Sequence, residues 1–582
     1  MACSRVCKAT GVVPIASLLL LCCCVIVGVT YAPAATPTPT PALEGQTFTF
    51  PWPPEWVAQG KYQKMILRGI IGFNPGQWDV QACGTLPDCL MPSGPQFNGL
   101  VYHNPVNPDE IVCDLCDGWT VSPNGKTYTF RLRQAQWHDG RPVTAEDIKF
   151  SLDRITQPGA IRVRTGVLRT FYEHQSAEVL DDRTVRVPIK FASPLFLENL
   201  ASEYMKMYPK HVTQGLSPEE AQQPGKLIGS GPWKVKELKP HISIEYERNR
   251  NYFKQGLPFF DGMIFTIVRD YNRRLAAMQV GQAQTTEGPT IGSYGNEDPM
   301  RIQRDTRGKV RGIYIPEAVQ TYLVLHMNKP PFDDPRVRRA VLLAIDRQEL
   351  VKIVRCAEPF GCFGSVGTFL PNKGGQVVES PEDLAQAKGW RQPKGQDVAE
   401  ASALMAAAGY PHGVKATLNL TTVPAVLRHG EVIAEQLRKS LGIDLTLDAV
   451  DRATSVDRTI RGTHHASLDS SGVILLDPAD YLNQHFLVMG GQKNPDRWSH
   501  PRLTEIIEAQ ARESEPLKRL SLFKEAVDIL RQGESHVVPL TWGFSGGMMD
   551  YRLQNFHVPG SEQIVKHFEH IWWDPDAPLP RD

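Results

Sequence analysis

The chain has 582 residues, and its 63 basic and 63 acidic residues leave no formal net charge. This balance excludes the strongly basic surface of a typical nucleic-acid-binding protein and gives no general attraction to an anionic membrane. A hydrophobic content of 41% and a charged content of 22% are ordinary for a large globular protein, and the length is enough for several domains.

The N-terminus has the features of an export signal. Arg5 and Lys8 precede an apolar run from Gly11 to Val29. Ala32-Pro33-Ala34 fits a cleavage site, so residues 1–34 are predicted to be a secretory signal peptide. The run is also as long as the shortest membrane-spanning helices, which leaves an uncleaved anchor open. With either, the body of the protein is expected outside the cytoplasm.

Lipoprotein processing is a third possibility for this N-terminus. Cys22, Cys23 and Cys24 are candidates for lipidation, although Leu21 departs from the small residue that should precede a lipidated cysteine. Residues 35–47, which contain alternating Thr and Pro, are predicted to form a semi-rigid tether. The expected location is the periplasm or the outer face of the cell membrane, with the body either free or held by an N-terminal anchor or lipid.

Six of the 11 cysteines lie in the body, an even number that predicts disulfides in an exported chain. Cys356 and Cys362 bracket a short loop and are expected to pair. For the other four, the local pairs are Cys83–Cys89 and Cys113–Cys116, but crossed pairing is equally allowed. The Cys-x-x-Cys spacing also occurs in redox and zinc motifs; we favour a local staple.

The stretch Tyr128–Ile155 predicts a strand, a tight turn and a capped helix. Tyr128, Phe130 and Leu132 alternate as in a half-buried strand, and Asp139-Gly140 supplies a turn. Thr144 is placed to cap a helix, with Asp147 three residues on. His138 and Asp139 could act as a base and its orienter, but adjacent residues of a turn point apart, so we interpret them as structural.

Later segments predict alternating strands and helices. Gly229–Trp233 has glycines but lacks a phosphate-loop pattern and leads into an alternating segment, so we interpret it as a chain reversal. Asp334-Pro335 starts a helix, and Gly430–Leu441 is an amphipathic helix ended by Gly442. Strands are expected at Thr184–Ile189, Gln320–Met327, Ile443–Leu447 and Val537–Leu540.

Five blocks of sequence, taken together and in order, resemble the peptide/nickel family of extracellular solute-binding proteins, which deliver ligands to ABC importers. The blocks are Trp119–Ile155; Gly229–Trp233 with Arg248–Phe253; Asn328–Arg347; Ala399–Gly413; and Asn494–Leu540. The resemblance implies an α/β, two-lobed periplasmic-binding-protein-like fold of class II, the large three-subdomain type.

The resemblance also implies a division of the chain. Lobe I would comprise residues 48–316, with an inserted subdomain at about 103–226, and lobe II residues 317–543. Residues 544–582 would return to lobe I. Closure of the lobes would be a hinge motion about the crossover segments 318–327 and 540–546.

The resemblance places ligand contacts in Gly472–Phe486. Peptide-binding members have an Asp four residues before the Pro of this block, which receives the α-amine of the peptide. Ile474 stands at that position here and cannot neutralise a buried ammonium. A shifted register, with Asp469 or Asp477 in this role, stays open. The full set of expected ligand contacts is Phe73, Tyr102, Ile474, Asp477, Tyr481, Trp542 and Phe544, since aromatic walls suit sugars, aromatic metabolites or cations.

The predicted function is non-catalytic: the exported substrate-binding component of an ABC importer, a monomer that captures a small organic solute, peptide-like or other, and delivers it to a membrane permease. We expect no cofactor, no metal and no nucleic acid. Two alternatives remain. Gly543–Gly547 matches the G-x-S-x-G pattern of a serine hydrolase with Ser545 as nucleophile. A nickel or metal-chelate binder of the same fold is the other, with His464-His465 as candidate ligands.

Overall fold

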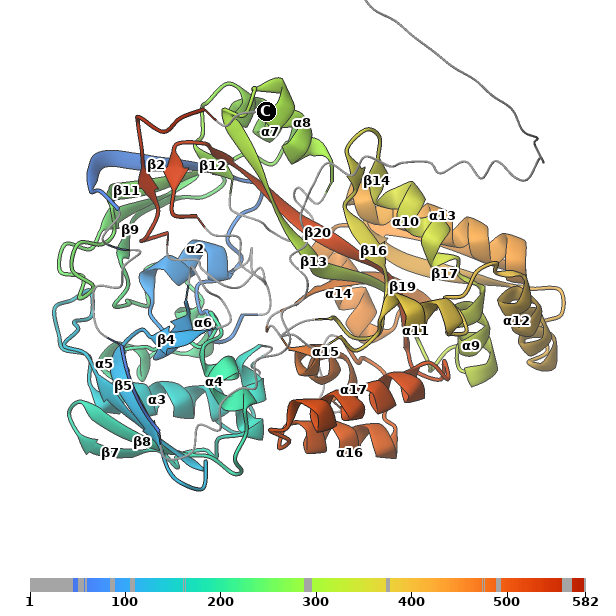
Figure 1. Ribbon diagram of the computed structural model, residues 1–582, viewed down its shortest axis with the longest axis horizontal. Coiled ribbons are helices and arrows are strands. Elements are labelled where there is room, and N and C mark those ends of the chain that lie inside the picture. Colours follow the sequence, from blue (N-terminus) through green and yellow to red (C-terminus); the bar gives the residue numbers. More distant parts are fainter. Residues whose placement is uncertain are drawn as a thin grey trace, which may run out of the picture. The chain divides into compact units, whose positions relative to one another are not determined.

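The structure is a computed structural model (Figure 1) that describes residues 46–50, 57, 60–83, 89–104, 110–160, 162, 164–286, 296–372, 377–473, 475, 477–487, 493–556 and 568–579. The predicted signal peptide, nearly all of the predicted tether, and Ile474 lie outside these residues. Within the described ranges, no helix is both long enough and apolar enough to cross a membrane.

A mixed sheet of 11 strands dominates the structure. Its parallel neighbours include β17 with β18 and β2 with β11, whereas β13, β19 and β20 pair antiparallel. In spatial order the strands are β18 (Ile443–Val450), β17 (Val414–Thr421), β19 (Ala466–Gly472), β13 (Val310–Leu325), β20 (Val537–Asp550), β12 (Thr285–Thr286), β2 (Gln63–Ile71), β11 (Phe260–Ile267), β10 (Ser243–Arg248) and β9 (Trp233–Lys239), and β16 (Gly364–Val366) pairs with β20.

Strands β13 and β20 are the longest of the sheet, with 16 and 14 residues, and run side by side (Figure 1). Their antiparallel register extends from Val310 opposite Asp550 to Val324 opposite Val537, with irregularities between Ile315 and Val319 and after Thr321. The two predicted crossover segments therefore lie against each other. The lobe boundaries themselves stay predictions.

A second sheet of five strands carries the strand–turn–helix module, and the module is confirmed. Helix α3 (Ala145–Thr156) begins at a capping box in which the Asp147 carboxylate accepts a hydrogen bond from the Thr144 amide at 3.0 Å. Ile148, Leu152 and Ile155 are fully buried, and Gly140 takes φ +89° in the preceding turn. The strand order is β1 (Thr47–Thr49), β5 (Cys116–Val121), β6 (Thr127–Leu132), β8 (Thr184–Pro188) and β7 (Glu178–Asp181).

The best-marked helices of the C-terminal half are also confirmed. Asp334 caps α9 (Pro335–Ala344) by accepting from the Arg336 amide at 2.8 Å. Asp346 likewise caps α10 (Arg347–Val354). Helix α13 (Pro424–Leu441) begins six residues before the predicted start, and Gly442 ends it at φ +68° before strand β18.

The chain reversal at Gly229 is explained by a close backbone approach. A Cβ on Gly229 would lie 1.8 Å from the carbonyl oxygen of Gln96. Strand β9 then begins at Trp233, so the glycines lead into a strand and not into a helix that could hold a phosphate.

All three disulfides form, each between the cysteines nearest in sequence. The pairs are Cys83–Cys89, Cys113–Cys116 and Cys356–Cys362. Crossed pairing is thereby excluded, and the Cys-x-x-Cys is a staple between β4 and β5.

The remaining elements cover the sheets or form short pairs. The helices are α2 (Met91–Ser93), α4 (Leu195–Leu200), α5 (Lys210–Thr213), α6 (Pro218–Ala221), α7 (Tyr271–Gln279), α8 (Asp298–Asp305), α11 (Pro381–Gln386), α12 (Gly395–Ala407), α14 (Arg452–Arg461), α15 (Pro478–Phe486), α16 (Pro501–Gln510) and α17 (Pro516–Leu530), with 3₁₀ turns at Gly94–Gln96 and Thr165–Thr170. The strand pairs are β3 (Val101–His103) with β4 (Ile111–Cys113), β14 (Cys356–Ala357) with β15 (Gly361–Cys362), and β21 (Leu553–Gln554) with β22 (Trp572–Trp573).

Candidate functional site

One face of the central strands carries polar and aromatic side chains beneath helix α15. Tyr322 of β13 lies opposite Asp469 of β19, and Gln320 lies opposite both Ser471 of β19 and Trp542 of β20. Residues directly opposite one another share a face of the sheet, and alternate residues of a strand do so too. We call this set, with Tyr481, Gln484 and His485 of α15 and with Lys493, the Asp469 cluster.

Helix α15 is fixed over this face by hydrogen bonds from its own side chains. The Tyr481 hydroxyl donates to Oε1 of Gln320, and Oε1 of Gln484 accepts from the Ser471 hydroxyl at 3.0 Å. The Tyr481 ring meets Trp542 edge-on with 5.8 Å between ring centroids. The helix therefore presents Tyr481 and Gln484 to the polar side chains of the sheet, while Leu482 and Phe486 pack in the apolar core.

Asp469 is the acid at the centre of the cluster. Its Oδ2 accepts from the Tyr322 hydroxyl at 3.0 Å and from Nζ of Lys493 at 2.8 Å. The Asp469 side chain is 25% exposed and that of Lys493 14%. Burial by itself raises the pKa of Asp469, but the charge and hydrogen bond of Lys493 outweigh it and lower this pKa below its ordinary value. Asp469 is thus an ionised carboxylate in a half-buried position.

Two cations accompany this acid. Burial lowers the pKa of Lys493, partly offset by Asp469, and the nearby charge of Arg164 lowers it further. Arg164 reaches the cluster from a distant part of the chain, where its Nη1 donates to Oε1 of Gln484 at 2.6 Å. Asp480 also contacts Gln484, accepting from its Nε2 at 2.9 Å, so the cluster and its immediate partners combine two carboxylates with two positive side chains.

His485 is buried within the cluster as a neutral imidazole. It stacks on Tyr481 with 3.9 Å between ring centroids and meets the edge of Tyr322 at 4.8 Å. Among the described residues neither ring nitrogen has a hydrogen-bond partner. Burial lowers the pKa of His485 well below its ordinary value, and the neighbouring positive charges act in the same direction. Such a ring retains one donor and one acceptor for a further group.

The two acids that the sequence leaves open differ in their surroundings. Asp477 caps α15 by accepting from the Ala479 amide at 2.8 Å, and it also forms two hydrogen bonds with Arg519, at 2.5 and 2.6 Å. Asp477 and Arg519 are both largely buried, so the role of Asp477 is to hold α15 against α17. Asp469 is the acid that lies in the cluster. Ile474 lies outside the described residues.

The predicted aromatic contacts divide into two groups. Tyr481 and Trp542 meet in the cluster, where the Trp542 indole N–H also donates to the Thr368 hydroxyl at 2.8 Å. Phe73, Tyr102 and Phe544 lie elsewhere. Phe73 packs against the apolar core around Trp78, and Phe544 meets the edges of Tyr314 and Phe363.

Tyr102 belongs to a buried ionic network. Nζ of Lys254 lies 4.2 Å from the centre of its ring, 2.7 Å from Asp114 and 3.0 Å from Glu569. Burial raises the pKa of Tyr102 to about 12. We interpret Tyr102 as a wall of this network, which ties the C-terminal segment at Glu569 to the strand pair β3–β4.

Several residues of the Asp469 cluster were not predicted from the sequence. Gln320 and Tyr322 stand in the alternating segment QTYLVLHM, and their alternation could have marked them as one face of a strand. Gln484 lies within the segment Gly472–Phe486 in which ligand contacts were expected, whereas Arg164 and Lys493 carry no local signal, because only the fold brings them to the cluster.

The hydrolase interpretation fails on the geometry of Ser545. Gly543–Gly547 lies inside strand β20, which continues to Asp550, so the sharp strand-to-helix turn of a nucleophile elbow is not formed there. Ser545 is 0% exposed. It is a sheet residue without access to a substrate.

The histidines singled out in the sequence, His138, His464 and His465, each have a partner within the fold. His464 lies 2.8 Å from Asp448, and His465 accepts from the Thr417 hydroxyl at 2.8 Å. His138 contacts the Gly231 carbonyl, whereas Asp139 pairs with His211. Over the ranges that the structure describes, no three His, Cys, Asp or Glu side chains are grouped as metal ligands would be.

A large mixed sheet whose two longest strands pair at the predicted crossovers, covered by many helices, has the fold of the class II periplasmic peptide-binding proteins. The chain belongs to the bacterial extracellular solute-binding proteins of family 5, because the model of that family's middle region matches residues 110–492.

Curated relatives agree with this family. The chain is 28% identical to the glutathione-binding protein GsiB of Salmonella typhi, over 73% of this chain and 79% of the relative. It is 25% identical to the dipeptide-binding protein DppE of Bacillus subtilis, over 78% and 81%.

Solved structures show the same fold. The murein tripeptide binding protein MppA of Escherichia coli superposes with a TM-score of 0.76 at 20% identity, covering 88% of this chain and 99% of that one. The Haemophilus influenzae OppA complex with the peptide RPPGFSPFR gives 0.75 at 18% identity, covering 88% and 100%.

These findings establish the class of function. The protein is a substrate-binding component of an ABC importer with the two-lobed class II fold. The family and these relatives are binding proteins and not enzymes, and the family is extracytoplasmic.

Proposed function

We propose that the protein captures a short peptide-like solute that carries both an ammonium and a carboxylate, and that it does so at the Asp469 cluster. The observation that carries the proposal is the half-buried, ionised Asp469 beside Lys493 and Arg164. The names of the relatives, a glutathione-binding and a dipeptide-binding protein, point to the same class of solute.

The charges of the cluster match the two ends of such a solute. An ammonium taken out of water needs a counter-charge, and Asp469 offers one within reach of the half-exposed face. Lys493 already neutralises Asp469, so a ligand carboxylate would bind Lys493 or Arg164 while the ligand ammonium takes the place of Lys493 at Asp469. Tyr322 and Tyr481 are fully buried, so they position Asp469 and Gln320 from beneath and do not themselves contact the solute.

Asp469 then takes the role that the family gives to an Asp four residues before Pro478. The position itself holds Ile474, and Asp477 is occupied by Arg519. An anchor displaced along the same strand–helix segment supports binding of a compact solute whose amine is placed differently from that of a standard dipeptide.

Binding between two lobes fits the contact of Arg164 with α15. Arg164 belongs to the subdomain predicted to be inserted in lobe I (103–226), and Gln484 belongs to predicted lobe II (317–543). We infer that this pair closes over the solute as the lobes hinge about residues 318–327 and 540–546, and that the closed monomer docks on a membrane permease.

Calorimetry with reduced glutathione, alanyl-alanine and their N-acetylated forms tests the proposal. We expect the free amine to be required and Asp469→Asn to weaken binding by at least about tenfold, since a charge-assisted hydrogen bond is lost. Asp457→Asn, at an exposed acid on α14, is the matched control and should leave binding unchanged.

The two parts of the proposal fail separately. If glutathione and dipeptides do not bind the wild-type protein, the solute class is wrong. If they bind and Asp469→Asn has no effect, the class stands and the assigned site is wrong.

A further inference from the structure

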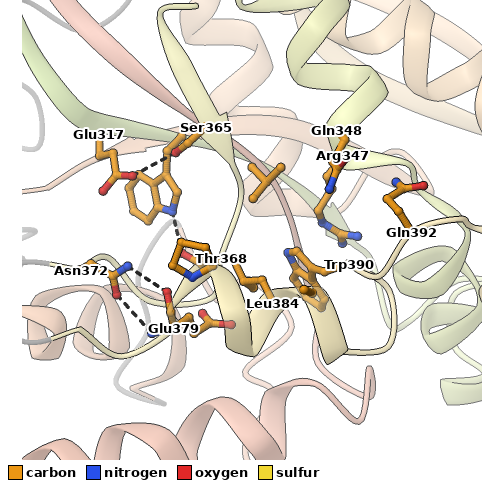
Figure 2. Close-up of a pocket in the computed structure, with 14 residues that line it drawn as sticks. Glu317, Arg347, Gln348, Ser365, Thr368, Asn372, Glu379, Leu384, Trp390 and Gln392 are labelled. Atoms are coloured by element: carbon orange, nitrogen blue, oxygen red, sulfur yellow. Dashed lines mark hydrogen bonds between the residues drawn. The ribbon is translucent and has the colours of Figure 1, made fainter. Parts of the chain in front are cut away.

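A cavity of about 350 Å³ lies between β16, the start of α10 and helix α11. Trp542 forms part of its wall, and Figure 2 shows Arg347, Trp390 and Gln392 together on one side of it, with Glu317 and Ser365 on the other. Its volume is in the range of small-molecule sites.

Arg347 is the unusual group in this cavity. It is 2% exposed, and its Nε and Nη1 donate to the carbonyl oxygens of Pro539 and Gly389 at 2.7 and 2.8 Å. Its other terminal nitrogen, Nη2, makes no hydrogen bond with any described residue. The guanidinium lies over the Trp390 ring, 4.2 Å from its centre.

No carboxylate of the described chain pairs with this buried cation. The nearby acids already have other partners: Glu379 accepts from Arg531 at 2.9 Å, Asp397 from Arg391 at 2.7 Å, and Asp346 caps α10. Burial lowers the pKa of Arg347 to about 9, although these carboxylates partly offset it. A buried charge is costly unless it is paired, so an anion brought to Nη2 would be stabilised.

The side chains that line the cavity indicate the chemistry of the rest of the ligand. Val366, Pro381 and Leu384 are apolar, and Trp390 and Trp542 add aromatic surface. Since Arg347 offers a single positive charge and one unoccupied nitrogen, a phosphate dianion would keep an excess charge, whereas a carboxylate would not. Glu317 accepts from the Ser365 hydroxyl at 3.0 Å, so the anionic end of a ligand belongs at Arg347 and not at Ser365.

We propose that this cavity is a second binding site, which takes a small monoanionic carboxylate with an apolar body and holds it through Arg347. The site does not rest on the proposed peptide function: it shares Trp542 with the Asp469 cluster, but Asp469 and helix α15 contribute nothing to its walls.

Hexanoate and hexanamide, which share a chain and differ in charge, are the probes. By calorimetry at millimolar concentration we expect hexanoate to bind at least about tenfold more tightly than hexanamide. Leu384→Trp should abolish binding by filling the cavity, while Ala406→Trp, on the exposed side of α12, should not. Asp469→Asn should also leave hexanoate binding intact.

Arg347→Met completes the test. Arg347 also donates to carbonyl groups at the end of α9, so its loss affects the fold as well as the cavity. Binding by Arg347→Met is therefore compared only if this variant unfolds at a urea concentration close to that of the wild type. If it unfolds earlier, Leu384→Trp, which keeps Arg347, decides whether hexanoate binds in the cavity. The proposal is overturned if hexanoate does not bind, if hexanamide binds equally well, or if hexanoate binding survives in Leu384→Trp.

Discussion

Tyr322 and Asp469 face each other across strands β13 and β19, and the Tyr322 hydroxyl donates a 3.0 Å hydrogen bond to the Asp469 carboxylate. The tyrosine is fully buried, whereas the carboxylate reaches the half-exposed face of the sheet. This bond orients the acid that we assign to the solute.

Tyr322→Phe should weaken solute binding without unfolding the protein. The substitution keeps the ring against His485 and removes one donor to Asp469, a loss of about 0.5–1.5 kcal/mol, or a factor of about 2 to 13 in the dissociation constant. Calorimetry with the solute that binds best measures the change. Tyr62→Phe, which removes the exposed hydroxyl bonded to Asp261, is the control. Equal affinities for Tyr322→Phe and the wild type would show that the Tyr322 hydroxyl does not orient Asp469 for solute binding.

Acid should destabilise the protein partly through His485. Its folded-state pKa is depressed well below 6.5 by burial, so the unfolded chain binds a proton in the range between the two values and the folded chain does not. Stability is therefore full above about pH 6.5 and falls as the pH drops below it, by up to about 1.4 kcal/mol per pH unit for this one group.

Urea unfolding of His485→Phe at several pH values between 7.5 and 5 checks this effect. The variant should show a shallower loss of stability on acidification than the wild type. His412→Gln, at an exposed position, should leave the pH dependence unchanged. Parallel curves for His485→Phe and the wild type would mean that His485 takes up its proton equally in the folded and the unfolded state, which contradicts a lowered folded-state pKa.

Asp477→Asn should cost about 3–5 kcal/mol of stability, because it leaves Arg519 buried without its partner. The expected result is a large drop in the urea midpoint, in contrast to the exposed Asp457→Asn. Solute affinity of the folded variant should stay near the wild-type value. A loss of solute affinity with unchanged stability would instead indicate that Asp477 contacts the ligand.

The three disulfides should differ in accessibility. Cys362 is exposed, whereas Cys83 and Cys89 are fully buried in a core with Phe97 and Tyr208. Mild dithiothreitol followed by alkylation and mass spectrometry should therefore modify the Cys356–Cys362 pair first. Replacing Cys83 and Cys89 by Ser should cost about 2–4 kcal/mol, and more than the same change at Cys356 and Cys362. Simultaneous reduction of all pairs would contradict this order.

The sequence by itself determined the features that depend on near neighbours. The capping box of Thr144 and Asp147, the helix start at Asp334 and the left-handed stop at Gly442 are set within a few residues, because a helix end is satisfied by adjacent backbone and side chains. Ordered blocks of such features were enough to identify the family and its fold. The pairing of Cys83, Cys89, Cys113 and Cys116 stayed open in the sequence, and the structure decided for the local pairs.

Only the tertiary structure decided which side chains share the candidate site. The sequence placed Asp477 among the expected ligand contacts and kept Asp469 only as an alternative, whereas in the structure Arg519, 42 residues beyond Asp477, pairs with Asp477 and Asp469 lies in the cluster. Arg164 meets Gln484 across 320 residues, and Tyr322 meets Asp469 across 147. Burial and pairing of charges depend on strand register and on the packing of distant segments, and no local pattern of residues encodes either one.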